Sequence, residues 1–365
     1  MSTAAYLVKK ASGLDVLAFL PARIGFRPVD SVVVGGLHPP NGRLGIVIRA
    51  DRTVGAFTAV GELASGQAER LHFSGARAAF MVRYAPVGCE PIEDDASFWQ
   101  WAGAIGERLA VIGCWDVVGE DYQEVDPGER RRFGPVYHPV DLQSTRGAAT
   151  LALAGLAPKA TREELAELGL APEASRKAAR AAERRATDRA LALGPGRMRR
   201  WRLTGLEVWL GWQGTLLDRP DANVPPPELG RIAALLADRP GRDAVMATAF
   251  ANRGDTARRL ATGCDDGQIF DPYHSAGLDP ERAAASLELL RKVGSHLAPR
   301  RRGPVYALGA AWHWWSGNGA AAEEWARAGV DCNDCPQLAW LILAVVARGV
   351  FPACLAALPE DLAVN

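Results

Sequence analysis

The sequence predicts an α+β or α/β protein, with a mixed β-sheet and packed helices followed by an all-helical C-terminal domain. Over the first 150 or so residues, short β-branched segments alternate with helix-like segments in the order β-β-α-β-α-β. The first two strand segments are joined by a short loop, so they must run antiparallel. From Ser144 onward the pattern is helical. We therefore expect an α/β domain over 1–157 and a helical domain over 158–365.

The N-terminal elements follow from local signals. The capping-box spacing of residues 12–15 opens a helix that we expect to end near Pro21. Strands are expected at 31–34 and 44–48, on either side of a Pro/Asn/Gly turn. The remaining expected elements are helices at 57–71 and 97–112 and strands at 78–84, 115–119 and 135–140.

The C-terminal half predicts a succession of helices, with a Gly-Pro-Gly break at 194–196. They are expected at 145–156, 174–193, 201–213, 227–237, 241–251, 280–297, 304–316, 319–328 and 336–348. One helix pair matches the spacing of a tetratricopeptide repeat, through Leu308, Gly309, Trp312, Ala321, Trp325 and Ala328. No second copy follows at the same period, so a repeat-like packing and a plain bundle both remain open.

Composition excludes several classes of protein. The chain has 365 residues, of which 48% are hydrophobic and 23% charged, which excludes a disordered or fibrous protein. Its 42 basic and 42 acidic residues exclude a globally polybasic protein, though not a local basic patch. The six cysteines are too sparse for a disulfide framework, and the start of the chain lacks the pattern of a secretory signal. The longest apolar run, 338–347, is too short to cross a bilayer. We expect a reduced, cytoplasmic protein with no membrane partner.

The strongest local charge signal lies in residues 176–202, which hold ten basic and two acidic residues, a net charge of +8. A spacing of four places Arg176, Arg180 and Arg184 on one stripe, opposite an alanine face that offers little area to hold the helix on a core. Such a helix attracts phosphate groups, but no known nucleic-acid-binding motif accompanies it. A nucleic acid, an acidic protein partner and a solvated helix without a partner remain open.

Tryptophan is concentrated around His313, at positions 312, 314 and 315. Aromatic side chains at this density form either a binding surface or the packing of a helix pair. His313 itself is expected to be a surface residue. The candidate binding residues are Arg176, Arg180, Arg184, Arg185, Arg199, Arg200, Trp312 and Trp315.

Cys332 and Cys335 form a C-x-x-C motif at an expected helix start, where the helix dipole would lower a thiol pKa. Zinc needs four ligands, and the other candidates, Cys264, His313 and Cys354, lack a second paired spacing. We therefore predict no metal and no cofactor, and interpret the two thiols as packed side chains beside a helix cap.

The α/β half contains residues that could act as acid, base or nucleophile, namely Asp30, Ser31, His138 and Asp141. Nothing resembling G-x-S-x-G, a P-loop or G-x-G-x-x-G positions them. The sequence therefore identifies no active site and favours a protein that is not an enzyme.

Four segments carry a resemblance to a known family: LAFLPARIGFRPVDSVVVGGL (17–37), LQSTRGAATLALAGLAPKATREEL (142–165), RDAVMA (242–247) and WSGNGAAAEEWARAGVD with LAWLILAVVARGVFP near the C-terminus. In this order they resemble the uncharacterised actinobacterial family called domain of unknown function 4192, over nearly the whole chain. The resemblance implies a cytoplasmic protein with an α/β N-terminal part and a helical C-terminal part. It implies no catalytic residues. The C-x-x-C motif departs from the family pattern, which argues against a redox function common to the family.

Two functions remain open. The favoured hypothesis is a non-catalytic interaction or regulatory protein, binding a protein partner or nucleic acid through residues 176–202 and a Trp-rich helical surface. The alternative is an enzyme with a small-molecule site at the junction of the two domains, using Asp30, His138 or Asp141. The sequence does not determine the oligomeric state.

Overall fold

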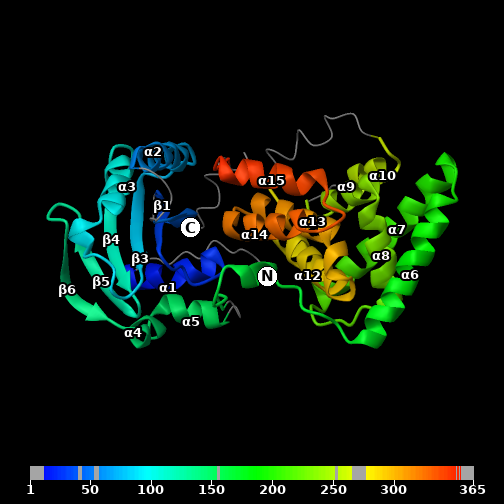
Figure 1. Ribbon diagram of the computed structural model, residues 1–365, viewed down its shortest axis with the longest axis horizontal. Coiled ribbons are helices and arrows are strands. Elements are labelled where there is room, and N and C mark those ends of the chain that lie inside the picture. The colour runs from blue at the N-terminus through cyan, green and yellow to red at the C-terminus, as the bar shows by residue number, and fades with distance from the viewer. Residues whose placement is uncertain are drawn as a thin grey trace. The chain divides into compact units, whose positions relative to one another are not determined.

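The computed structural model describes residues 12–39, 43–52, 57–153, 157–250, 254–264 and 277–350, together with Pro352 and Cys354. Within this part of the chain two compact units follow one another, an α/β unit that ends at Leu165 and a helical unit that begins at Ala166 (Figure 1). The predicted fold class, a mixed sheet with packed helices followed by a helical region, is confirmed. None of the described helices is long and apolar enough to cross a membrane.

The α/β unit is built on one six-stranded sheet of order β2-β1-β3-β4-β5-β6. Its strands are β1 (Ser31–His38), β2 (Arg43–Asp51), β3 (Ala78–Ala85), β4 (Ala110–Val118), β5 (Asp121–Asp126) and β6 (Arg131–Tyr137). β3 and β4 run parallel, and the other neighbouring pairs are antiparallel, including the expected β1–β2 pair. β5 is not among the strands expected from the sequence, because its segment DYQEVD is polar and lies at the solvent-exposed side of the sheet.

Helices cover both faces of this sheet. They are α1 (Gly13–Ile24), α2 (Phe57–Phe73), α3 (Ala96–Gly106), α4 (Pro139–Gln143) and α5 (Arg146–Leu153). Successive residues of β1 show the layers: a Cβ added at Gly35 would lie 3.9 Å from Leu20 of α1, and one added at Gly36 would lie 3.1 Å from Leu71 of α2. Because successive residues of a strand point to opposite faces, α1 and α2 pack on opposite sides. Every residue of β1 is accordingly buried.

Several expected boundaries in this unit are wrong. The strand expected at 135–140 is β6, which ends at Tyr137, because Pro139 begins the helix α4. The helix expected to reach residue 112 ends at Gly106, and β4 begins at Ala110, because Gly103 and Gly106 weaken the helix and a β-branched pair follows. The first helix continues through Pro21 to Ile24, and Gly25, with a φ of 99°, forms its left-handed cap.

The helical unit contains nine described helices of eight residues or more, counted over residues 166–250, 254–264 and 277–350. They are α6 (Glu173–Leu191), α7 (Pro195–Asp218), α8 (Pro226–Ala237), α9 (Arg239–Ala247), α10 (Gly254–Ala261), α12 (Pro280–His296), α13 (Gly303–Trp315), α14 (Gly319–Val330) and α15 (Gln337–Ala347). The expected helix at 201–213 begins earlier, because Pro195 occupies the first helical turn, where its missing N–H is tolerated.

α6 packs closely against α8, although its buried face is mostly alanine. A Cβ added at Gly230 of α8 would lie 2.1 Å from the carbonyl oxygen of Ala179 and 2.9 Å from the amide nitrogen of Glu183. Ala179 and Ala182 are buried at this contact. The expectation that the alanine face offers too little area to hold this helix on a core is therefore wrong. Small residues let the backbones of α6 and α8 approach closely, and this close contact buries surface of both helices.

The expected pair of helices is α13 and α14, joined by a short turn with Gly317 at a φ of 77°. A Cβ added at Gly309 would lie 2.1 Å from Cε3 of Trp325, so the indole ring lies directly on the backbone of α13. Trp325 is fully buried and meets Tyr306 edge to face. This small-residue and aromatic packing is the arrangement that the repeat-like spacing predicts.

The α6–α8 contact can be tested by adding bulk at Gly230. The variant Gly230→Val places side-chain atoms where the backbone of α6 lies, so we expect unfolding by urea to show a loss of about 1–3 kcal/mol or more. Gly214→Ala in α7 is the control, since an added Cβ there meets nothing within 4 Å. That variant is expected to be neutral or stabilising by up to about 1 kcal/mol. Equal stability of the two variants would contradict the packing.

Candidate functional site

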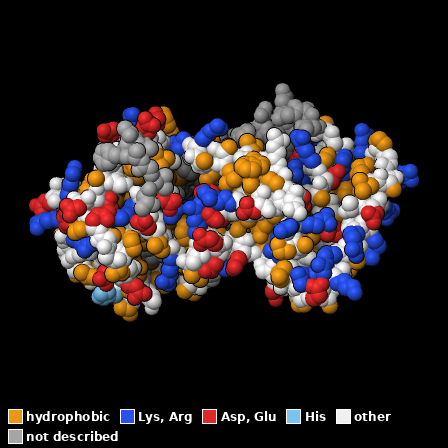
Figure 2. All heavy atoms as spheres, in the orientation of Figure 1, with side chains coloured by type: hydrophobic (Ala, Val, Ile, Leu, Met, Phe, Trp, Pro, Cys, Tyr) orange, Lys and Arg blue, Asp and Glu red, His pale blue; other side chains and the backbone are white. Residues whose placement is uncertain are grey.

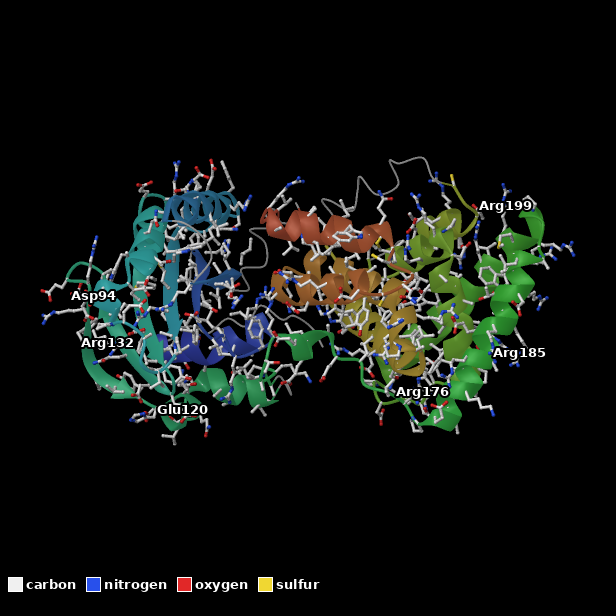
Figure 3. The ribbon with its side chains drawn as sticks, viewed as in Figure 1. Asp94, Glu120, Arg132, Arg176, Arg185 and Arg199 are labelled. Atoms are coloured by element: carbon white, nitrogen blue, oxygen red, sulfur yellow. The ribbon has the colours of Figure 1, made fainter. Side chains whose placement is uncertain are left out.

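The basic segment 176–202 is divided between two helices, α6 and the start of α7. Seven of its side chains are exposed and have no acidic atom within 4 Å among the described residues, and we call these seven the basic ridge. They are Lys177, Arg184, Arg185 and Arg189 on α6 and Arg197, Arg199 and Arg200 on α7. Figure 2 shows Lys and Arg side chains gathered over the part of the unit formed by α6. In Figure 3, Arg176, Arg185 and Arg199 are spread from the first turns of α6 to the start of α7.

The other predicted basic residues are paired within the unit. Arg176 and Arg180 both form ion pairs with Glu173, in the first turn of α6. Arg202 donates two hydrogen bonds to Asp238, at 2.7 and 3.0 Å. These three arginines therefore carry less uncompensated charge than the basic ridge.

One acidic residue holds α6 in place. Glu183 is buried, and its carboxylate lies 2.9 Å from the guanidinium of Arg301. Burial raises the pKa of Glu183, and the charge of Arg301 opposes that shift. Together with the contact at Gly230, this ion pair fixes the helix on which most of the basic ridge stands.

The predicted tryptophan surface is instead part of the core. Trp312 is fully buried, lies 6.1 Å from the ring of Trp209 and donates a hydrogen bond from Nε1 to the carbonyl oxygen of Met246. Trp315 is buried against Phe250, with ring centres 5.2 Å apart. Neither indole is accessible to a partner while the helical unit is folded, which corrects the prediction that they form a binding surface.

His313 also departs from expectation, because its ring packs into the unit. Its centre lies 5.4 Å from that of Trp325, and its Nε2 is buried and makes no hydrogen bond among the described residues. The guanidinium of Arg291 lies over the same indole, 5.3 Å from the ring centre. Burial, reinforced by the charge of Arg291, lowers the pKa of His313 to about 3.

This burial predicts a pH-dependent stability. The unfolded chain binds a proton at His313 below about pH 6.5, whereas the folded chain binds it only near pH 3, so the contribution of His313 is present above pH 6.5 and is lost as pH falls through that window. We expect His313→Gln to reduce the slope of the unfolding free energy with pH between pH 3 and 6.5. The reduction should correspond to the uptake of up to about one proton fewer on unfolding. His72→Gln, at an exposed ring, is the control. If the slope of unfolding free energy with pH were unchanged in His313→Gln, the His313 ring would not be buried in its neutral form.

The C-x-x-C thiols are not activated. Cys332 Sγ is directed at the carbonyl oxygens of Ala328 and Pro299, at 3.2 and 3.4 Å. Burial raises the pKa of Cys332 to about 11 and also raises that of Cys335, and the charge of Asp334 acts in the same direction on both. The expectation that a helix dipole lowers these pKa values is wrong. Among the described residues, no group of three or more His, Cys, Asp or Glu side chains is placed to hold a metal ion.

Each of the four candidate catalytic residues has a structural partner. Asp30 accepts a hydrogen bond from Arg52 at 2.9 Å, and Ser31 donates to the carbonyl oxygen of Val29 at 2.6 Å. Asp141 caps α4 by accepting from the amide of His138 at 2.8 Å, while the exposed His138 ring lies 3.1 Å from an oxygen of Asp121. The structure does not bring these residues together as nucleophile, base and acid.

A charged network inside the α/β unit was not predicted. Arg83 of β3 is fully buried and donates two hydrogen bonds to Asp116 of the parallel strand β4, at 2.7 and 3.0 Å. It also donates to Asp95 at 3.1 Å, and Asp95 accepts a second hydrogen bond from Arg52 at 2.7 Å. Arg132 of β6, which is labelled in Figure 3, donates to Asp116 at 2.6 Å. The network therefore joins β3, β4, β6, the start of α3 and the residue that follows β2.

The network lies where the parallel strands β3 and β4 approach their carboxyl ends, the side of an α/β sheet where ligands usually bind. Here the charges satisfy one another. Burial alone would lower the pKa of Arg83, but the hydrogen bonds and charges of Asp116 and Asp95 outweigh it and hold that pKa above its ordinary value. The signal in the sequence was a single charged residue inside each of two apolar strands, AAFMVRYA and AVIGCWDVV.

Breaking this network is expected to be costly. Asp116→Asn leaves the buried Arg83 without its carboxylate partner, so unfolding by urea should show a loss of about 3–5 kcal/mol. The double variant Arg83→Met with Asp116→Leu should recover part of that loss, because both buried charges are removed. Asp94→Asn, at an exposed neighbouring acid, is the control and should change stability by less than about 0.5 kcal/mol. If Asp116→Asn were as stable as this control, the network would not contribute the expected stability and the prediction would be wrong.

Comparison with known proteins gives one result. A family model described as a domain of unknown function, DUF4192, matches residues 14–265, which span the α/β unit and the helical unit as far as the residues that follow α10. The two C-terminal segments of the resemblance lie beyond the matched residues. No curated protein and no solved structure matches the chain. Since the match covers more than half of the chain, this protein belongs to the DUF4192 family.

Proposed function

We propose that this protein is a non-catalytic interaction protein whose helical unit binds an acidic macromolecule through the basic ridge. The observation that supports the proposal is the set of seven exposed cations, none with an acidic atom within 4 Å among the described residues, on two adjoining helices. Charges of one sign attract a polyanion over a distance set by the ionic strength, and each neutralised phosphate releases counterions.

Rigidity supports the same proposal. Most of the ridge stands on α6, which is fixed by the backbone contact at Gly230 and by the buried pair of Glu183 and Arg301. Cations on a fixed helix lose little conformational freedom of the backbone when they bind, which favours association. The candidate partners are a nucleic acid and an acidic protein, and the salt dependence of binding distinguishes them. A duplex gives a steep linear loss of log affinity with log salt, about 0.9 per phosphate contact.

The test compares two triple variants that remove the same charge. Arg184→Gln, Arg185→Gln and Arg199→Gln together remove part of the basic ridge. Arg231→Gln, Arg258→Gln and Arg327→Gln together remove arginines that already pair with neighbouring acids. Fluorescence anisotropy with a labelled DNA duplex, a single-stranded RNA and a polyglutamate peptide measures binding at low salt.

We expect the ridge triple to weaken binding of at least one polyanion about tenfold or more and to lower its salt slope by about 2 to 3, whereas the control triple stays within about twofold. Equal losses in the two triples would show that only net charge matters and would contradict the proposal. Absence of binding to all three polyanions at low salt would also contradict it.

A further inference from the structure

A groove of about 320 Å³ lies in the α/β unit between α3, the start of β4 and the turn that joins β5 to β6. Its lining residues are Trp99, Ala102, Gly103, Gly106, Leu109, Ala110, Val111, Pro127 and Arg130. None of the residues of the basic ridge lines it. The volume lies at the lower end of the range for small-molecule sites.

The groove exists because two neighbouring strands diverge. β4 begins at Ala110, but its pairing with β5 begins only at Trp115, opposite Glu124. β5 nevertheless continues to Asp126, where it pairs with β6. The first residues of β4 therefore have no strand neighbour on this side, and the gap opens toward the β5–β6 turn.

Small residues of α3 keep the groove open. Trp99, Ala102, Gly103 and Gly106 lie three or four residues apart and share one face of the helix. A Cβ added at Gly103 or at Gly106 would meet nothing within 4 Å, so the space above both glycines is empty of protein. Glycine weakens a helix interior by up to about 1 kcal/mol relative to alanine, and here no close contact explains its presence.

One cation borders this space. Arg130 is the only charged residue in the lining, and its guanidinium lies 5.5 Å from the centre of the Trp99 ring. No acidic atom lies within 4 Å of it among the described residues, because neighbouring Glu129 pairs with Arg131 at 2.5 Å. The indole of Trp99 is itself fixed, since its Nε1 donates to the carbonyl oxygen of Ile92 at 2.6 Å.

The backbone of Arg130 is strained. Its φ is 53°, in the left-handed region that favours glycine, at the last position of the turn before β6. A bulky residue there costs about 1–2 kcal/mol, and the fold needs only the turn, which glycine would form more easily. The arginine side chain therefore contributes something that the turn itself does not require.

We propose that this groove binds a small, flat monoanion such as an aromatic carboxylate. The carboxylate accepts hydrogen bonds from Arg130, and the ring lies over Gly103 and Gly106 against the apolar start of β4. The planar guanidinium matches the two oxygens of a carboxylate, and the side chains of the lining other than Arg130 carry no charge and suit an aromatic body. This proposal is independent of the basic ridge.

The test uses 2-naphthoate as the probe and neutral 2-naphthamide as its matched control. Saturation-transfer NMR detects binding to the full chain, and calorimetry measures the dissociation constant. We expect 2-naphthoate to bind with a dissociation constant of about 1 mM or below, and 2-naphthamide to bind about tenfold more weakly or worse.

Two variants remove the site without disturbing the fold. Arg130→Gly removes the cation and relieves the positive φ, so we expect at least a roughly tenfold loss of 2-naphthoate binding with an unchanged or higher melting temperature. Gly103→Leu fills the empty space with a better helix former and should abolish binding without lowering the melting temperature. Arg131→Gln, at the neighbouring arginine, should retain the affinity of the natural protein within about twofold.

Failure to detect 2-naphthoate at about 5 mM would overturn the proposal. Equal affinity for the amide, or undiminished binding by Gly103→Leu or Arg130→Gly, would overturn it as well, since the ligand would then bind elsewhere. The ridge triple Arg184→Gln, Arg185→Gln and Arg199→Gln should bind 2-naphthoate normally. A loss of 2-naphthoate binding in that variant would place the ligand on the helical unit and would also contradict binding in the groove.

Discussion

The buried pair of Arg83 and Asp116 is the interaction on which the α/β unit depends. A guanidinium with no exposed surface is tolerable only when its donors are satisfied, and here Asp116 and Asp95 satisfy them from two different elements. Because Asp95 is also the N-cap of α3, the same carboxylate sets where that helix begins. The start of α3 and the carboxyl end of β4 are therefore positioned together, and the groove lies between α3 and the other end of β4.

In the helical unit the controlling constraint is steric rather than ionic. At Gly230 and Gly309 the absence of a side chain lets a neighbouring backbone or indole ring approach more closely than any larger residue permits. The first contact fixes α6, and so determines where the cations of the basic ridge stand. The second seats Trp325 in the core, beside His313. A helix rich in alanine and arginine thus becomes a fixed surface through its neighbours rather than through its own apolar area.

Features that depend on neighbours along the chain could be predicted from the sequence. The capping box at residues 12–15 and the aromatic and small-residue spacing of α13 and α14 follow from such local rules. Features that depend on residues distant in the chain could not. β5 is polar and becomes a strand only because β4 and β6 pair with it, and the end of α3 was extended because a short apolar run fits either period. Aromatic density alone does not distinguish a surface from a core, so only the fold shows that Trp312 belongs to the core.

The sequence by itself determined the two-part α+β organisation, most of the helices and the local charge surplus, because periodicity, capping residues and composition act over a few turns of chain. Only the tertiary structure decided which charges remain free. It paired Arg176 and Arg180 with Glu173 and Arg202 with Asp238, left Arg185 and Arg199 exposed, and set Arg130 over Trp99 beside an empty groove. Whether a charge is paired, and whether a groove stays unfilled, depends on which side chains folding brings within a few ångströms of it. No local sequence pattern encodes that distance.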